Sequence, residues 1–297
     1  MKKLNSLEYS RGDRVLLAFD YLLLALIVII VAYPLLFVIK SSFSSPTYGM
    51  AAYSLLPKKL TLQGYRAVFE YRPIWTSYLN SIYYMIIGTI VNILITICCA
   101  YPLSRRDLAG RRFFSVFFVF TMHFSGGLIP NYLLARNLHI LNTLWVMILP
   151  GALSVYNMIV TRTYFSNQIP DELREAAVLD GCGNMRLLIS IVLPLSGSVI
   201  SVITLFYAVS HWNAYFHPMI YLSSRNKYPL QVILRELLIL NQQNSAMSDV
   251  SDVVDFEQRA NLMKYSLITV ASLPVMMIYP FVQKFFVKGV MIGAVKG

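Results

Sequence analysis

Six long runs without a charged residue constrain the fold of this 297-residue chain more than any other feature. The runs occupy residues 21–39, 73–104, 113–135, 137–161, 187–224 and 265–283. Because about 20 apolar residues cross the hydrocarbon core of a bilayer as a helix, each run is long enough for one span. Hydrophobic residues make up 57% of the chain and charged residues only 13%, a balance that excludes a soluble globular domain. The sequence therefore predicts an all-α membrane protein with six transmembrane helices.

The expected membrane domain covers residues 15–288, between an N-terminal tail at 1–14 and a C-terminal tail at 289–297. We expect the spans at about 15–39, 76–103, 113–134, 143–162, 192–220 and 264–284. The longest run carries Pro194 and Pro218 near its ends, where one helix would begin and stop, so it is interpreted as one span. The first run is too long for a cleaved signal peptide and lacks its small-residue cleavage pattern, so it is expected to remain as the first helix.

Lysine and arginine residues indicate the orientation. An even number of spans places segments 1–14, 104–112, 162–190 and 284–297 on one side, and these hold 14 of the 25 Lys and Arg residues. Basic loops stay preferentially in the cytoplasm, which predicts that both termini and the segment at 162–190 are cytoplasmic. The net charge of +11 is then explained by contact with the anionic inner leaflet rather than by nucleic-acid binding. The three cysteines show no metal or redox spacing, and no metal or cofactor is expected in this chain.

The segment at 170–191 between the fourth and fifth spans predicts a short cytoplasmic helix. Pro170 suits a first helical turn, Asp171 and Glu172 complement the positive end of the helix, and Gly181 suits its end. Helical spacing places a small, mostly apolar stripe on one face, with Arg174 and Glu175 beside it; the stripe consists of Leu173, Ala176, Ala177 and Asp180.

A second helix is expected to resume at about Asn184 and to continue through Pro194 into the fifth span. Such a rigid continuation would transmit force from the cytoplasm to the membrane domain. From the residues alone, an ordinary amphipathic loop with a glycine turn remains an equally good interpretation of this segment.

The segment also resembles a known family. The E-A-A at 175–177, the glycine at 181 and the I-x-L-P at 191–194 match the pattern of the permease subunits of bacterial ABC importers. Three further stretches resemble the carbohydrate-import branch: GGLIPNYLLARNLHILNT at 126–143, HWNAYFHPMIYL at 211–222 and GVMIGAVKG at 289–297. The likeness covers most of the chain from the second span onward.

The resemblance implies the six-helix fold of type I (MetI-like) importer permeases, in a bacterial plasma membrane. It implies that the short helix is the coupling helix, seated in a cleft of a partner ATPase, with Glu175 paired to a basic residue there. The residues implied in ATPase coupling are Leu173, Arg174, Glu175, Ala176, Ala177, Asp180 and Gly181. Implied partners are a second, homologous permease, two copies of the ATPase that use ATP and Mg, and an extracellular binding protein that delivers a sugar, expected to be an oligosaccharide.

The sequence itself contains no ATP-binding motif. No G-x-x-x-x-G-K-[ST] phosphate loop occurs, and the Gly126-Gly127 pair is followed by Leu-Ile-Pro. We therefore expect a transport subunit that is not an enzyme and that receives its energy from a partner.

Polar side chains inside the spans are the candidates for the substrate path, since such groups are costly against lipid and usually face protein or water. Sugars suit this lining because hydroxyl groups bond to amides and their apolar faces stack on aromatic rings. A lone Asn or His in a span more often bonds a neighbouring helix than a solute, and this alternative remains open for each of them. The candidates are Asn92, His123, Asn157, His211, Trp212 and Asn213.

Two other classes of function are alternatives to a permease subunit. A stand-alone secondary carrier or channel for a small polar solute is the main alternative, but an ion-coupled carrier would be expected to bury acidic residues, and none of the six runs contains Asp or Glu. A membrane enzyme would need a clustered set of acids, bases or metal ligands. The H-E-x-x-H and G-x-S-x-G signatures of such enzymes are missing.

Overall fold

The structure of the protein is a computed structural model that describes residues 11–44, 60–243, 263–278 and 280. The predicted C-terminal tail at 289–297 lies outside the described residues. The labelled helices are α1 (Arg11–Ser42), α3 (Gln63–Glu70), α4 (Arg72–Ser104), α5 (Arg111–His123), α6 (Leu128–Asn137), α7 (Leu144–Ile148), η1 (Leu149–Gly151), α8 (Val155–Gln168), α9 (Asp171–Leu179), α10 (Asn184–Leu187), η2 (Leu188–Val192), α11 (Leu193–Leu195), α12 (Gly197–Trp212), α13 (Phe216–Tyr221), η3 (Arg225–Lys227) and α14 (Leu230–Gln243). One more apolar helix spans Met263–Ile278.

The chain divides into two compact units, Met1–Glu70 with Leu240–Val270 and Tyr71–Ile239 with Ala271–Gly297. In the first unit, α1 is a continuous helix of 31 apolar-rich residues from Gly12, and none of its most apolar 18-residue window is buried. Its last turn contacts the Met263 helix, because Ser266 Oγ donates a hydrogen bond to the Ser42 carbonyl at 3.2 Å. A helix with apolar side chains exposed along its length is suited to contact with lipid or with another membrane helix.

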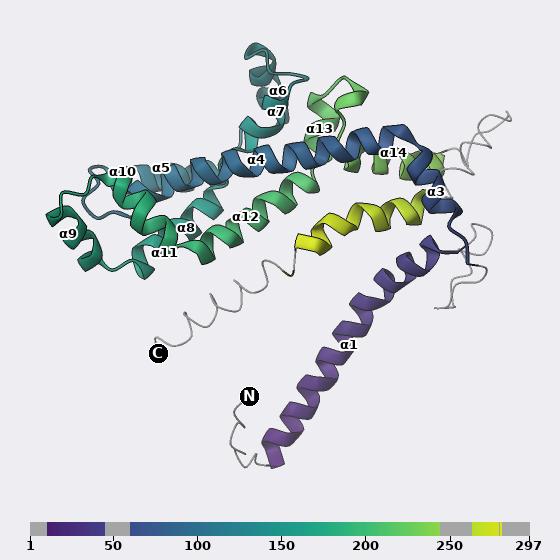
Figure 1. Cartoon of the computed structure of the whole chain (residues 1–297), viewed down its shortest axis with the longest axis horizontal. Coiled ribbons are helices and arrows are strands. Elements are labelled where there is room, and N and C mark those ends of the chain that lie inside the picture. The colour runs from purple at the N-terminus through teal and green to yellow at the C-terminus, as the bar shows by residue number, and fades with distance from the viewer. Residues whose placement is uncertain (1–10, 45–59, 244–262, 279, 281–297) are drawn as a thin grey trace. The chain divides into compact units, whose positions relative to one another are not determined.

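The second unit is built around α4, which Figure 1 shows running alongside α12. Polar groups join three of its helices inside the core. Thr96 Oγ1 on α4 and the Tyr207 hydroxyl on α12 share a hydrogen bond of 2.7 Å, and the Ser154 amide before α8 donates to the same hydroxyl at 3.1 Å. In an apolar environment such bonds are the usual way in which membrane helices fix their register. The apolar core beside them includes Ile97, Ala100, Met158, Phe165, Ile203 and Leu187.

Three of the expected spans are not continuous helices. The stretch at 113–134 breaks into α5 and α6, whose axes differ by 112°, since Phe124 is extended and Gly127 adopts a φ of +85° that favours glycine. The stretch at 143–162 bends by 56° between η1 and α8, after a 3₁₀ turn that contains Pro150. The expectation of one continuous helix across each of these stretches is therefore corrected.

The expected rigid passage from Asn184 into the fifth span is also wrong. Residues Leu188–Val192 form a π-helical turn, and Asn184–Leu195 meets Gly197–Trp212 at 84°. Pro194 has no N–H for the helical ladder, which accounts for the irregular turn that precedes it. The buried Ser196 Oγ at the corner has no hydrogen-bond partner within the described residues. The expected span at 192–220 is likewise divided, because α12 ends at Trp212 and α13 follows it.

By length and composition, α1 and α4 are each able to cross a membrane, and the three bent pairs are possible broken spans or re-entrant segments. The count of six spans remains a prediction.

A loop junction closes the end of the second unit opposite α9. Asn142, with a φ of +57°, accepts bonds on Oδ1 from the Ser223 and Ser224 amides at 3.2 and 3.1 Å, and its Nδ2 donates to Ser224 Oγ. The Lys227 ammonium donates to the Asn142 carbonyl at 2.6 Å. One asparagine thus holds the turn before α7 against the loop after α13. We call this group the Asn142 junction.

Candidate functional site

The short helix α9 projects from one end of the second unit, beside the C-terminal end of α4 (Figure 1). Pro170 precedes it with extended backbone, and Asp171 and Glu172 occupy its first turn, as predicted from the sequence. Gly181 ends it with a φ of +74°. The Cys182 amide donates to the Ala177 carbonyl at 2.9 Å and the Gly181 amide to the Val178 carbonyl at 3.0 Å, which together form a Schellman motif.

The faces of α9 differ from the predicted stripe. Ala177 points inward and is 7% exposed, as part of the core of the second unit. Leu173, Ala176 and Asp180 are exposed, so the four residues do not present a common docking surface. The reason is that Ala177 packs against the unit that carries the helix. We call the solvent-facing side the outer face of α9; it comprises Glu172, Leu173, Glu175, Ala176, Val178 and Leu179.

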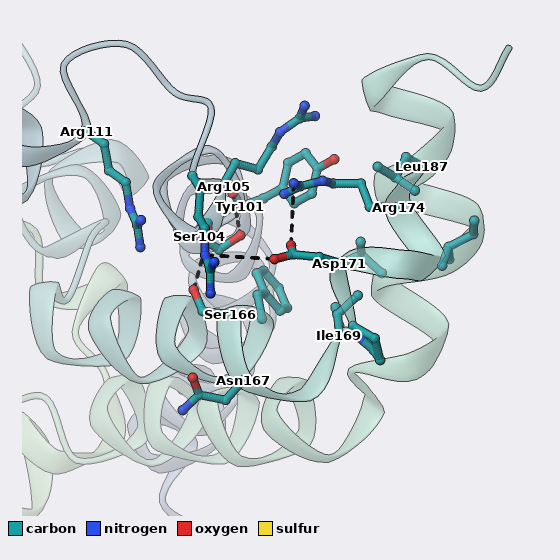
Figure 2. Close-up of a pocket in the computed structure, with 15 residues that line it drawn as sticks. Tyr101, Ser104, Arg105, Arg111, Ser166, Asn167, Ile169, Asp171, Arg174 and Leu187 are labelled. Carbon is teal, nitrogen blue, oxygen red and sulfur yellow. Dashed lines mark hydrogen bonds and ion pairs between the residues drawn. The ribbon is translucent and has the colours of Figure 1, made fainter. Parts of the chain in front are cut away.

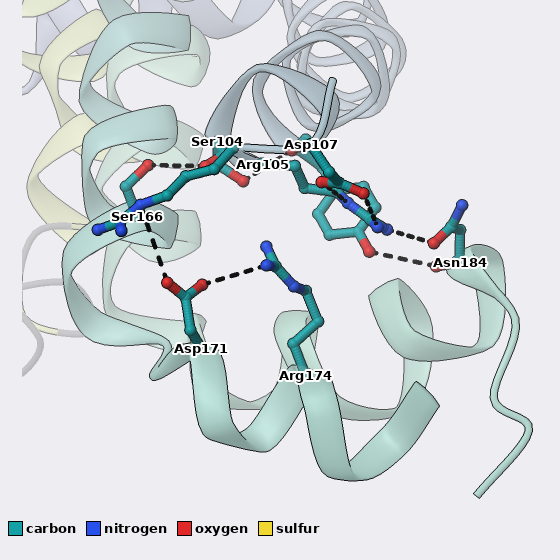
Figure 3. Close-up of polar contacts among 9 residues, drawn as sticks. Ser104, Arg105, Asp107, Ser166, Asp171, Arg174 and Asn184 are labelled. Carbon is teal, nitrogen blue, oxygen red and sulfur yellow. Dashed lines mark hydrogen bonds and ion pairs between the residues drawn. The ribbon is translucent and has the colours of Figure 1, made fainter. Parts of the chain in front are cut away.

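The turn after α9 is clamped to the end of α4 (Figure 3). The Arg105 guanidinium donates to Asn184 Oδ1 and also makes two bonds to the Asp107 carboxylate, at 2.9 and 2.5 Å. The Tyr101 hydroxyl donates to the Asn184 carbonyl at 3.5 Å. Hydrogen bonding from Arg105 lowers the pKa of Asp107 to about 2, while Asp107 raises the pKa of Arg105. The clamp therefore stays ionised at neutral pH and fixes the first residue of α10.

The start of α9 is attached through Asp171. Its carboxylate lies 3.8 Å from Arg106 Nε, in the loop after α4, and 3.4 Å from an Arg174 Nη, one turn further along α9 (Figure 2). These groups belong to the wall of a cavity of about 260 Å³. The first turn of α9 and the start of α10 are thus both connected to the segment that follows α4.

A second cavity, of about 350 Å³, lies within the helices of the same unit and brings together Asn92, Asn157 and His211. Asn92 is 2% exposed, and its Nδ2 donates to the Gly151 carbonyl at 3.3 Å. Asn92 Oδ1 and His211 Nε2 are buried and have no hydrogen-bond partner among the described residues. The imidazole of His211 lies directly on Gly88, where an added Cβ would come within 2.4 Å of Nε2.

The other three path candidates do not line this cavity. Trp212 is 1% exposed, and its indole N–H donates to the Ala271 carbonyl at 3.0 Å, so it serves as a packing residue. His123 is exposed at the end of α5, with Nδ1 3.0 Å from the Val119 carbonyl oxygen. Asn213 is an exposed residue at the end of α12.

Sequence reasoning missed the residues that attach α9. Arg105 and Asp107 were visible only as charges in a basic loop, and Asn184 only as the approximate start of a helix. Arg105 and Asn184 lie 79 residues apart along the chain, and spacing in one sequence does not reveal such a pair. The signal that was available is the Arg-Arg-Asp turn directly after a long apolar helix, where side chains commonly bond the next element.

The comparisons with known proteins agree with this architecture. The family described as binding-protein-dependent transport system inner membrane component matches residues 74–292. The chain therefore belongs to this family of transport permeases, and the predicted resemblance is confirmed. A stand-alone carrier is not favoured.

Individual relatives match almost the whole chain. Protein LplC of Bacillus subtilis is 36% identical over 299 residues, covering 100% of both chains. The polygalacturonan/rhamnogalacturonan transport system permease protein YtcP of the same organism is 38% identical over 284 residues, covering 94% of this chain and 98% of the relative. A solved structure of a bacterial ABC transporter involved in the import of the acidic polysaccharide alginate has a chain with a TM-score of 0.84 at 30% identity, covering 94% of this chain and 99% of that one. The all-α permease fold is thereby established.

Proposed function

We propose that this chain is one of two permease subunits of an ATP-driven importer of oligosaccharides, with α9 as its coupling helix. Its partners in this proposal are a second, homologous permease, two copies of an ATPase that bind ATP and Mg, and an extracellular binding protein. The chain itself contributes no ATPase site. Both termini and α9 face the cytoplasm, and solute crosses by rigid-body alternation of the two permeases.

The observation that carries the coupling role is the outer face of α9. Leu179 is 88% exposed, Val178 54% and Leu173 44%, on a helix of nine residues that also exposes Glu175. Exposed apolar side chains gathered on a short helix are typical of an interaction site. Glu175 is suited to pair with a basic group at the edge of such a contact. The clamp at Asn184 and the attachment at Asp171 would hold this face in one orientation.

The test uses the complete transporter reconstituted with its own partners. We expect Glu175→Gln to lower both binding-protein-stimulated ATP hydrolysis and sugar uptake by about tenfold, because a charged pair at a buried contact is lost. Glu236→Gln, the same change on α14 at the other end of the unit, is the matched control and is expected to leave both rates unchanged. Unaltered stimulation and uptake in Glu175→Gln would remove the coupling assignment.

The cargo proposal rests on the second cavity and on the relatives. YtcP is named for polygalacturonan and rhamnogalacturonan transport, and the solved transporter for import of the acidic polysaccharide alginate. A cavity lined by asparagine and histidine side chains, one of them with an unpartnered amide oxygen, and with no Asp, Glu, Lys or Arg in its wall, suits hydroxyl groups. We include Asn92, Asn157 and His211 in the substrate path on this basis.

The path is tested separately from coupling. Asn92→Leu keeps the volume of the side chain and removes its polar atoms, so we expect sugar uptake to fall about fivefold while ATP hydrolysis without binding protein is unchanged. Asn213→Leu is the control, because Asn213 is exposed outside the cavity. Equal uptake in the wild type and Asn92→Leu would exclude Asn92 from the path.

A further inference from the structure

Arginine side chains from three parts of the second unit meet around the cavity of about 260 Å³ beside α9 (Figure 2). The loop between α4 and α5 contributes Arg105 and Arg106, and the first residue of α5 is Arg111. The fourth, Arg174, belongs to α9. Asp171 is the carboxylate in the described wall. The cavity thus combines four guanidinium groups with one acidic group.

The charges in this wall are not balanced. Arg105 is matched by Asp107, as described above. Arg106 and Arg174 share Asp171 at 3.8 and 3.4 Å, which is longer than the roughly 2.7–2.9 Å of a good charge-assisted bond. Arg111 donates through Nε to the Leu103 carbonyl at 2.9 Å, which leaves its two terminal nitrogens for another acceptor. Apart from the Arg105–Asp107 pair, the wall therefore holds three guanidinium groups and one carboxylate, an excess of two positive charges.

Partial burial of some of these arginines strengthens their attraction for an anion. Of the arginines that share Asp171, the Arg174 side chain is only 23% exposed, whereas that of Arg106 is 81% exposed at the rim. Positive charges held partly out of water attract an anion more strongly than freely solvated ones, because solvent screens them less.

We propose that this cavity is a binding site for a phosphate group. Guanidinium groups present forked pairs of N–H donors that match the oxygens of phosphate. The same chemistry is offered by a soluble phosphorylated compound and by the headgroup of an anionic phospholipid. The site goes beyond the transport role proposed above and does not depend on it.

The position of Asp171 makes the site competitive with the attachment of α9. A phosphate bound by Arg106 and Arg174 takes the donors that Asp171 now uses. Binding would therefore loosen the first turn of α9 from the loop after α4, and Asp171 would oppose binding by occupying the same guanidinium groups. If α9 has the coupling role proposed above, an anion in this cavity regulates transport.

The competition predicts opposite effects for two substitutions. The full chain is placed in phosphatidylcholine nanodiscs, and its unfolding temperature is titrated with inorganic phosphate at constant ionic strength. We expect Arg106→Gln to weaken the apparent Kd for phosphate about fivefold and Asp171→Asn to tighten it by a similar factor. Arg112→Gln is the matched control, since Arg112 lies six residues further along the chain, is exposed and is outside the cavity wall.

A second arm distinguishes the two sources of phosphate. In nanodiscs that contain phosphatidylglycerol, a lipid-occupied site would weaken apparent phosphate binding to the wild type but not to Arg106→Gln, whereas a site for soluble compounds would bind equally in both lipids. Either result supports the proposal. It is overturned if phosphate does not stabilise the wild type in phosphatidylcholine, if Arg106→Gln and Arg112→Gln weaken binding equally, or if Asp171→Asn binds no tighter while its helix content is unchanged.

Discussion

Replacement of Gly181 by alanine isolates the contribution of one backbone conformation to the position of α9. Gly181 has a φ of +74°, and an added Cβ would meet no atom within 4 Å. Steric overlap is therefore absent, and the cost is that of holding an L-residue in the left-handed region, about 1–2 kcal/mol. That energy opposes the two Schellman bonds from the Gly181 and Cys182 amides. We expect these two amides to exchange their hydrogens about 5- to 30-fold faster in Gly181→Ala than in the wild type.

Amide hydrogen exchange followed by mass spectrometry over residues 171–187 measures this effect. Gly183→Ala is the matched control, because Gly183 lies two residues away with an ordinary φ of −72° and is equally free of neighbours within 4 Å. Gly181→Asn should fall between the two, since asparagine tolerates positive φ better than alanine. Equal protection in Gly181→Ala and Gly183→Ala would refute the argument from backbone strain.

Three further predictions concern other parts of the second unit. Gly88→Ala places a Cβ 2.4 Å from His211 Nε2 and should lower the unfolding free energy by about 1–3 kcal/mol, measured by denaturation in detergent; an unchanged value would contradict the close approach. Asn142→Ala removes the three side-chain bonds of the Asn142 junction and strains a φ of +57°, so proteolysis near 138–143 should accelerate at least tenfold, with less effect for Asn142→Gly. Arg105 lowers the pKa of Asp107 to about 2, so the stabilisation from this pair is present above the ordinary carboxyl pKa and is lost as pH falls through about 2. The carboxyl chemical shift of Asp107, followed during a pH titration, checks this expectation. A titration midpoint near 4 would be incompatible with the clamp.

The class of the fold followed from hydropathy because burial in lipid imposes a long uncharged run on every span. Hydropathy did not reveal whether each of those helices is continuous. The 112° break before Leu128 depends on the φ of Gly127, and the same glycine is tolerated in a straight helix at modest cost. The position of Pro194 in the sequence predicts the start of a helix, whereas Pro194 lies within a bent one. Local residues permit a break, and packing against neighbouring helices decides whether it occurs.

The limits of helix α9 were predictable because local chemistry sets them. Pro170 and the acidic first turn begin the helix and Gly181 ends it. Its orientation was not predictable, because Ala177 and Ala176 are equivalent by composition and only tertiary packing decides which is buried. The residues of the second cavity were likewise only partly predictable from the sequence. Asn92, Asn157 and His211 were selected as polar residues in apolar runs, yet Trp212 met the same criterion and is used for packing.

The 84° corner at Ser196 has a mechanical consequence for any movement that starts at α9. If the chain continued straight, displacement of α9 along the membrane normal would translate α12 along its own axis. Because Asn184–Leu195 and Gly197–Trp212 meet near a right angle, the same displacement would instead tilt or rotate α12 about the corner. Tilting widens one mouth of a helical bundle while it narrows the other.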